Sequence, residues 1–362
     1  MTVNGRSRLL KILHIDPEKR WGGGEAQVLG LLSYLAERGH HNDLLTHPDG
    51  RLFQRSQALN VRALPLVVRN DLDFRPVLWL RRLIRREDYD IVHLHTKRAH
   101  ALSLWLSHRS TRPKYVVTRR MDYPESKTWY TRCLYNRKVD GVVAISQKIS
   151  ELLIETGVKC DAIRLIYSGV DPRPFKTVAN GLDVHPERLV IGMAAVLEER
   201  KGHRLLLEAA WRLKERGCQI SYRFAGEGSL KKSLEEATLQ LGLNEDVQFQ
   251  GFVSDMPGFL ANVDVVVLPS LFEGLGVSVL EAMAAGLPVV TSNRSALPEV
   301  AGDAAILVNP EDTGALADVL RELTTDQALR SRLVAAGAAR AARFSWERTV
   351  KETWDAYQNL LV

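Results

Sequence analysis

The sequence contains few cysteines. Only three occur among its 362 residues, Cys133, Cys160 and Cys218, and they are widely separated. Neither a disulfide framework nor a zinc-binding cysteine pair is therefore expected. This low use of cysteine is typical of a reducing compartment, so we expect a cytoplasmic protein.

Long apolar runs are also missing. The longest, such as VVVLP at residues 265–269, are far shorter than the roughly 20 residues that span a bilayer. The first apolar stretch is interrupted by Lys11 and His14, which is unlike the core of a signal peptide. A chain of 362 residues exceeds what one hydrophobic core usually supports, so two domains are expected.

Charge is distributed unevenly. The net charge of +6 combines +12 over residues 1–175 with −6 over the remainder. The basic half favours an anionic partner, such as an anionic or lipid-linked glycan acceptor or the inner face of an anionic membrane, although a solvated basic surface would look the same. The acidic second half argues against nucleic acid as a partner.

Residues 76–87, PVLWLRRLIRRE, predict an amphipathic basic helix. Its apolar stripe consists of Val77, Leu80, Leu83 and Ile84. Its basic face consists of Arg81, Arg82, Arg85 and Arg86. Such a helix either covers a sheet or contacts a membrane through its basic face with help from Trp79.

Short apolar runs alternate with helical periods along the whole chain, which predicts parallel sheets covered by helices. The expected architecture is α/β, with two doubly wound Rossmann-like domains facing each other across a cleft. Residues 169–188 are rich in Pro, Gly and polar residues and are expected to link them. We place the domains at residues 1–175 and 176–345, with a C-terminal helix at 346–362.

Glu281 interrupts an otherwise apolar helix predicted from about Val277 to Ala285. A carboxylate in such a helix is costly unless it is hydrogen-bonded. One carboxylate can accept from both hydroxyls of a ribose, which makes a nucleotide a candidate partner. A backbone group or a buried arginine is the alternative.

The loop before this helix has the chemistry of a phosphate and sugar site. Glu273 can accept from sugar hydroxyls, while Gly274 and Gly276 allow close backbone approach to a diphosphate at the helix N-terminus. Arg200 and Lys201 follow another predicted strand, where cations can neutralise a leaving diphosphate. Ligands of doubly wound sheets bind at such strand ends.

The run EGLGVSVLEAMAAGLPVV resembles the E-x7-E signature of the family-4 retaining glycosyltransferases of GT-B fold. Similar landmarks follow in order over nearly the whole chain: WGGGEAQVLGLLSYLAERGH, DIVHLH, VVAISQKISELL, IYSGVDPRPF, RKGHRLLLEA, GEGSLKKSLEE and VQFQGFV. The resemblance implies a GT-B fold whose C-terminal helix returns toward the N-terminal domain.

The resemblance also implies site residues. Glu273 with the backbone of Gly274, Leu275 and Gly276 would hold the donor sugar and diphosphate, and Glu281 the ribose. The base would lie against Val253, near Glu227, and the backbone of Gly23 and Gly24 would face a phosphate. His95 and Asp122 would lie on the acceptor side.

The implied activity is metal-independent transfer of a hexose from a nucleoside diphosphate sugar, with UDP slightly favoured, to a hydroxyl in cell-envelope glycan synthesis such as lipopolysaccharide or exopolysaccharide. No cofactor or metal is expected. A GT-B phosphorylase, a sugar-nucleotide epimerase and a non-catalytic nucleotide-sugar-binding protein are the alternatives.

Three positions depart from the family pattern. Val196 stands where many members have arginine, and Arg200 would supply that charge. Arg120 stands where many have a histidine that contacts the donor sugar, so we expect a catalytic role for Arg120. Ser168 replaces a usual asparagine.

Three rival motifs carry less weight. Gly22 to Gly24 with the later Asp43 only partly match a dinucleotide fingerprint, because Gln27 holds the third glycine's place. Asp71 and Asp73 resemble the metal motif of the other large glycosyltransferase fold, GT-A, but also suit a helix N-cap. The spacing of His93, His95 and His100 does not suggest a metal site.

Overall fold

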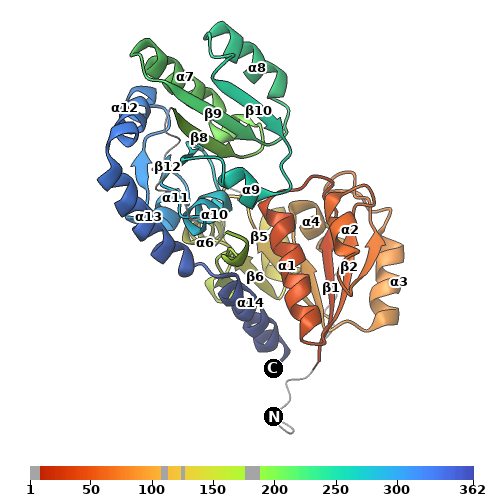
Figure 1. Cartoon of the computed structure of the whole chain (residues 1–362). Helices are drawn as coiled ribbons and strands as arrows, with labels where there is room; N and C mark the ends of the chain where they lie inside the picture. Colours follow the sequence, from red (N-terminus) through yellow and green to blue (C-terminus); the bar gives the residue numbers. More distant parts are fainter. Residues whose placement is uncertain (1–8, 107–112, 124–126, 176–187) are drawn as a thin grey trace. The chain divides into compact units, whose positions relative to one another are not determined.

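The structure, a computed structural model, describes residues 9–106, 113–123, 127–175 and 188–362 (Figure 1). The chain forms two compact units. Unit 1 comprises residues 1–167 and 349–362, and unit 2 comprises residues 168–348. Most of the expected linker at 169–188 lies outside the described residues.

Unit 1 contains a parallel sheet of seven strands in the order β3-β2-β1-β4-β5-β6-β7. Its central strands are apolar without alternation because both faces are buried. The strands are β1 (Lys11–Asp16), β2 (His41–Thr46), β3 (Arg62–Pro65), β4 (Ile91–Leu94), β5 (Lys114–Arg119), β6 (Gly141–Ala144) and β7 (Ile163–Leu165).

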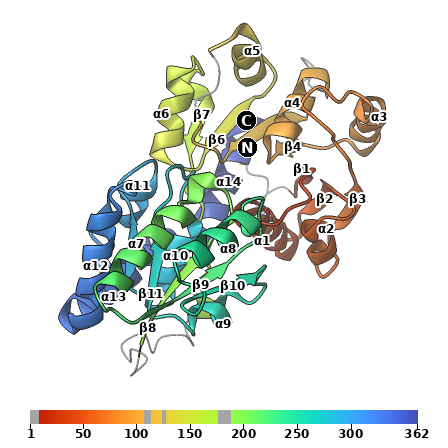
Figure 2. The same ribbon diagram turned by 90° about the horizontal axis from the view of Figure 1, so that it is seen from above.

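Helices surround this sheet (Figures 1 and 2). They are α1 (Gly23–Glu37), α2 (Arg51–Ser56), α3 (Val77–Glu87), α4 (Lys97–Leu106), α5 (Trp129–Arg137) and α6 (Gln147–Glu155). The apolar stripe of α3 is buried at all four expected positions, so this stripe packs inside the unit.

Unit 2 repeats the pattern with a parallel six-stranded sheet in the order β10-β9-β8-β11-β12-β13. Its strands are β8 (Leu189–Ala194), β9 (Ile220–Ala225), β10 (Val247–Gly251), β11 (Val265–Leu268), β12 (Val289–Ser292) and β13 (Ile306–Val308). Its α-helices are α7 (His203–Glu215), α8 (Lys231–Gln240), α9 (Met256–Leu260), α10 (Val277–Ala284), α11 (Leu297–Ala301), α12 (Thr313–Thr325) and α13 (Gln327–Ala342).

Both sheets reverse their strand order once. The reversal lies between β1 and β4 in unit 1 and between β8 and β11 in unit 2. In doubly wound sheets the connections leave such a pair toward opposite faces, which opens a crevice at the carboxyl ends of the two strands. The topology therefore gives each unit one favoured place for a ligand.

The last helix, α14 (Trp346–Leu361), completes unit 1. Tyr357 is fully buried with its hydroxyl 2.5 Å from Nδ1 of His93. The Trp354 ring stacks on His40 at 4.1 Å, and Leu360 fills the space that a side chain at Gly141 would take. No helix of the described ranges has both the length and the apolar content needed to cross a bilayer.

Candidate functional site

Two loops follow β8 and β11, the strands between which unit 2 reverses its strand order. The first loop contains a short 3₁₀ helix, η3 (Glu199–Lys201), whose Arg200 carbonyl accepts the backbone N–H of Leu271 at 2.8 Å. Gly202 permits this contact, because a Cβ there would lie 2.2 Å from the Pro269 carbonyl oxygen. The two loops are thus held together by their backbones, as a rigid site requires.

A buried ion pair joins the same loops. Nζ of Lys201 lies 2.5 Å from Oε1 of Glu273, and a guanidinium nitrogen of Arg200 lies 4.0 Å from Oε2. Arg200 also binds Glu198 at 3.0 Å. The structure therefore brings together the three side chains that the sequence assigned to the diphosphate and sugar. Their pairing with one another, across 72 positions, was not anticipated.

The backbone after Glu273 leads directly into α10. The Ser295 hydroxyl accepts the N–H of Glu273 at 3.1 Å and donates to its carbonyl at 2.7 Å, which fixes the loop. Gly276 has a φ of 94° and lies against the Leu297 side chain, where a Cβ would come within 2.6 Å. Leu275 points into the core. The N-terminal N–H groups of α10 consequently begin beside the Lys201–Glu273 pair.

Glu281 lies one turn into α10 and differs from Glu273. Its carboxylate has no hydrogen-bond or ion-pair partner among the described residues, although part of its surface stays accessible. Desolvation by the surrounding protein raises its pKa from 4.5 to about 7. The alternative to a ribose, a hydrogen bond from a backbone group or a buried arginine of the protein, is not found among the described residues.

The remaining expected residues of unit 2 lie at neighbouring strand ends. Glu227 follows β9, and its carbonyl accepts the N–H of Leu197 at 3.0 Å in the loop after β8. Val253 follows β10 and is partly buried. Both positions border the same edge of the sheet, farther from the reversal of strand order than Glu273.

In unit 1, the equivalent edge carries a charged cluster. Asp16 ends β1, Arg120 directly follows β5, and Glu25 lies in the first turn of α1. The Arg120 side chain lies against Gly24, where a Cβ would come 3.2 Å from its Cδ. A Glu25 carboxylate oxygen accepts the N–H of Gly22 at 2.7 Å, which holds the glycine loop at the helix start.

The groups of this cluster shift one another's pKa values. Burial, then the Glu25 charge, raises the pKa of Asp16, and burial also raises that of Glu25. Burial lowers the pKa of Arg120, and the charges of Asp16 and Glu25 act in the opposite direction. The two carboxyl groups therefore favour the charged form of Arg120, and its guanidinium offers hydrogen-bond donors at this edge of the sheet. Asp122 is buried two residues beyond it, and the exposed Gly23 starts α1.

Three buried histidines lie beneath the charged cluster. His14 Nε2 lies 3.3 Å from the Asn42 amide oxygen, and His14 Nδ1 lies 3.0 Å from His95 Nε2. Because the Asn42 amide nitrogen donates to the His40 carbonyl, its oxygen faces His14, which must carry the proton on Nε2. His95 then donates through Nε2, and its buried Nδ1 remains an unpartnered acceptor.

Sequence spacing missed this histidine cluster because β1 and β4 are far apart in the chain. His14, His93 and His95 are the one group of potential metal ligands within the described residues. His93, however, is engaged at both nitrogens, by Tyr357 at 2.5 Å and Thr118 at 2.7 Å. The hydrogen-bond partners favour a polar network over a metal centre. His100 lies apart, against Tyr135.

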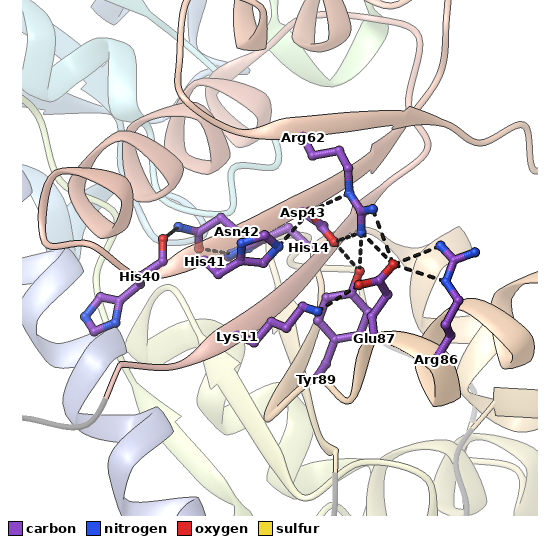
Figure 3. Close-up of polar contacts among 10 residues, drawn as sticks. All are labelled: Lys11, His14, His40, His41, Asn42, Asp43, Arg62, Arg86, Glu87 and Tyr89. Carbon is purple, nitrogen blue, oxygen red and sulfur yellow. Dashed lines mark hydrogen bonds and ion pairs between the residues drawn. The ribbon is translucent and has the colours of Figure 1, made fainter.

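The rival motifs have structural partners instead. Asp43 is fully buried and binds Arg62 and Tyr89, and Arg62 lies between Asp43 and Glu87 (Figure 3). Asp43 is therefore unavailable to a ribose.

The two aspartates of the D-x-D motif do not act together. Asp73 accepts from Nε of Arg75 at 2.7 Å and from the N–H of Arg69 at 2.9 Å, which caps the turn before α3. Hydrogen bonds from Arg75 hold the pKa of Asp73 well below its usual range. Asp71 lies 3.9 Å from Lys97. The helix N-cap expected from the sequence is not formed, because the N-cap residue of α3 is Pro76 and has no side-chain cap hydrogen bond.

Comparison with known proteins agrees with this geometry. Residues 21–173 match the family described as Glycosyltransferase Family 4, and residues 177–340 match Glycosyl transferases group 1. The chain is 30% identical to the lipopolysaccharide core biosynthesis glycosyltransferase LpsE of Rhizobium meliloti, over 97% of this chain and 99% of that protein. It is 29% identical to the phosphatidyl-myo-inositol mannosyltransferase of Mycobacterium leprae, over 94% and 93%.

A solved structure has the same fold. Anabaena HepE in complex with UDP-glucose superposes with a TM-score of 0.83 at 22% identity, covering 96% of this chain and 100% of that one.

Proposed function

Because the chain belongs to the family-4 glycosyltransferases of GT-B fold, we propose that it transfers a hexose from a nucleoside diphosphate sugar to an acceptor hydroxyl with retention of anomeric configuration. The observation that carries this proposal is the arrangement of side chains where the loops after β8 and β11 meet in unit 2. There an unpartnered carboxylate, Glu281, and a paired one, Glu273, flank the start of one helix.

Glu281 is the proposed ribose ligand. An accessible carboxylate with no protein partner and a pKa of about 7 lacks the hydrogen bonds that would stabilise its charge. A vicinal diol supplies two such bonds and no competing negative charge. Ribose binding should therefore lower the pKa of Glu281, so that nucleotide binding releases a proton near neutral pH.

Lys201, Arg200 and the N-terminus of α10 are the proposed diphosphate ligands. They are cations and N–H donors fixed before the substrate arrives, which is the condition for electrostatic stabilisation of a leaving group. In the free protein Glu273 balances the Lys201 charge at 2.5 Å. We propose that Glu273 turns its second oxygen to a hydroxyl of the donor sugar.

Transfer then needs no protein nucleophile. The bond from the anomeric carbon to the phosphate oxygen breaks while the acceptor oxygen bonds to the same face of that carbon, and the departing phosphate oxygen takes the acceptor proton. Lys201 and Arg200 stabilise the charge that develops on the diphosphate, so we propose that no metal takes part. Arg120 is the proposed donor of hydrogen bonds to the sugar, in place of the family's usual histidine.

UDP is the favoured nucleotide because HepE is described in complex with UDP-glucose. The acceptor is proposed to be a lipid-linked, anionic cell-envelope glycan, because the two relatives act on lipopolysaccharide core and phosphatidyl-myo-inositol and because the first 175 residues carry +12. A cytoplasmic position at the inner face of the membrane follows from such an acceptor.

Calorimetry with UDP, GDP, ADP and their hexose derivatives tests the donor assignment. We expect one nucleoside diphosphate to bind and its sugar to be transferred, with the anomeric configuration read by NMR of the product. Absence of nucleotide binding would contradict the proposal. Release of free sugar 1-phosphate or interconversion of the sugar would instead favour a phosphorylase or an epimerase.

A further inference from the structure

The outward side of α3 and the turn before it expose an unusual set of apolar side chains. The exposed fractions are 66% for Leu72, 68% for Phe74, 66% for Leu78 and 42% for Trp79. None belongs to the buried stripe that the sequence singled out. The apolar character of this segment thus extends to both sides of the helix.

The end of α4 adds a second tryptophan to the same region. Nε of Arg81 donates to the Trp105 carbonyl at 2.9 Å, which fixes the end of α4 beside α3. Trp105 as a whole is 39% exposed. We call the exposed residues of this region the α3 face: Leu72, Phe74, Leu78, Trp79, Arg82, Arg85, Arg86 and Trp105.

Two arginines of the α3 face have uncompensated charge. Arg82 and Arg85 are exposed and have no hydrogen bond or ion pair within the described ranges. Arg86 differs, because it binds Glu87 at 2.8 Å. Glu87 belongs to the ion cluster of Lys11 and Arg62 (Figure 3), where these cations hold its pKa at about 2.

The arrangement of charge identifies the kind of partner. At about 100° per residue, Leu78, Arg82, Arg85, Arg86 and Trp79 share about a third of the helix circumference, with arginines between the apolar side chains. A protein interface usually gathers apolar residues in a centre that charged residues avoid. A lipid surface accepts the mixture, because rings enter the headgroup layer while guanidinium groups bind phosphates.

From this geometry we infer that the α3 face docks on an anionic phospholipid surface. The inference deepens the membrane position named in the proposed function and rests on it for biological context only. Phe74, Leu78 and the two tryptophans enter the interface, and Arg82 with Arg85 contacts lipid phosphates. The side of α3 that faces the sheet takes no part, since its stripe is already buried.

Cosedimentation of the full chain with phosphatidylcholine vesicles, with or without phosphatidylglycerol, tests the inference at low and high salt. The parent should bind the anionic vesicles and lose binding as salt rises. Arg82→Gln/Arg85→Gln should weaken binding about 30-fold, since each arginine near an anionic leaflet contributes about fivefold. Leu78→Ser/Trp79→Ser should weaken it at both salt concentrations.

Matched controls come from unit 2. Arg321→Gln/Arg332→Gln removes two exposed arginines, and Trp211→Ser/Leu239→Ser removes two exposed apolar side chains, without touching the α3 face. Both should sediment like the parent. Thermal unfolding and vesicle-free nucleotide binding should be unchanged in all four variants.

The inference would be overturned if the parent did not bind anionic vesicles. It would also be overturned if the variants of the α3 face sedimented like the parent or like the controls. Nucleotide binding is measured without vesicles, so this measurement tests the proposed donor site independently of vesicle binding. A parent that binds vesicles but no nucleotide would keep the docking surface and remove the proposed function.

Discussion

The two sheet edges share a strand order but differ in what fills them. In unit 2, the loops at the reversal hold the ion pairs of Lys201 and Arg200 with Glu273, and the helix that follows carries Glu281, which has no partner among the described residues. In unit 1, the corresponding edge is crowded by Asp16, Glu25 and Arg120 above three buried histidines. A site that satisfies its own charges can orient a neutral substrate. A site with an unsatisfied carboxylate requires a ligand that donates hydrogen bonds.

The difference predicts that the two units contribute to different steps of the reaction. Unit 2 should determine nucleotide affinity and leaving-group chemistry, because its unsatisfied groups gain most from a ligand. Unit 1 should affect the rate more than nucleotide affinity, because its Arg120 guanidinium already lies beside the carboxyl groups of Asp16 and Glu25.

Lys201→Met should have the largest effect. It removes the cation nearest the proposed leaving diphosphate, and we expect kcat to fall about 10²–10³-fold, which corresponds to about 3–4 kcal/mol. Lys214→Met is the matched control, because Lys214 also pairs with a carboxylate, Asp246 at 2.9 Å. Steady-state kinetics at saturating donor gives the comparison. Equal rates in the two variants would remove Lys201 from the chemistry.

The pH dependence of stability should be the next largest effect. The folded protein holds the Glu281 proton up to about pH 7, whereas the unfolded chain loses it near 4.5. The folded state therefore binds more protons in that window, and its stability falls as pH rises from about 4.5 to 7, by about 3 kcal/mol. Denaturant midpoints of the parent and Glu281→Gln should diverge on acidification, with the parent gaining more. Parallel profiles would show that this carboxyl has an ordinary pKa.

Glu281→Ala should weaken nucleotide binding by about 1–3 kcal/mol, because two hydrogen bonds to the ribose are lost. Glu273→Ala should mainly lower turnover, because its carboxylate lies beside the sugar and Lys201. Calorimetry with the nucleoside diphosphate separates the two variants. An unchanged affinity in Glu281→Ala would remove the ribose assignment.

Arg120→Gln tests unit 1. We expect kcat to fall about tenfold while nucleotide affinity stays at the parent value, because the neighbouring carboxyl groups of Asp16 and Glu25 offset the attraction of Arg120 for a diphosphate. Arg120→His, which restores the family's usual residue, should recover part of the rate. A loss of nucleotide affinity in Arg120→Gln would erase the proposed contrast between the units.

Chelation should have the smallest effect. Activity is expected to survive excess EDTA, because Lys201 and Arg200 supply the positive charge and Asp73 is held by Arg75. Activity measured before and after chelation, with manganese added back, checks this expectation. Loss of activity that manganese restores would contradict the metal-free proposal.

The local elements of the proposed donor region could be predicted from the sequence because the residues that form them are close together in the chain. The apolar run before Glu273, the glycine before α10 and the apolar helix around Glu281 all lie within about one strand–loop–helix unit. Strand ends also locate Arg200 and Lys201, since parallel strands share one edge. Family resemblance supplied the role of each residue.

Contacts between distant segments could not be predicted in the same way. The Lys201–Glu273 pair and the His14–His95 hydrogen bond join strands whose register is set by tertiary packing. The apolar stripe of α3 was recognised, but periodicity alone did not show that Phe74, Leu78 and Trp79 form a second, exposed apolar side. Glu281 was expected to have a partner, and nothing in the sequence distinguished a protein partner from a ligand.

The return of residues 349–362 to unit 1 has a consequence for the order in which the protein can be made. During synthesis, most of unit 1 emerges from the ribosome before unit 2, yet His93, His40 and Gly141 lack their contacts with Tyr357, Trp354 and Leu360 until unit 2 has been made. A nascent chain therefore carries an incomplete first unit while the second unit is synthesised. The unit that begins to form first is completed after the other one.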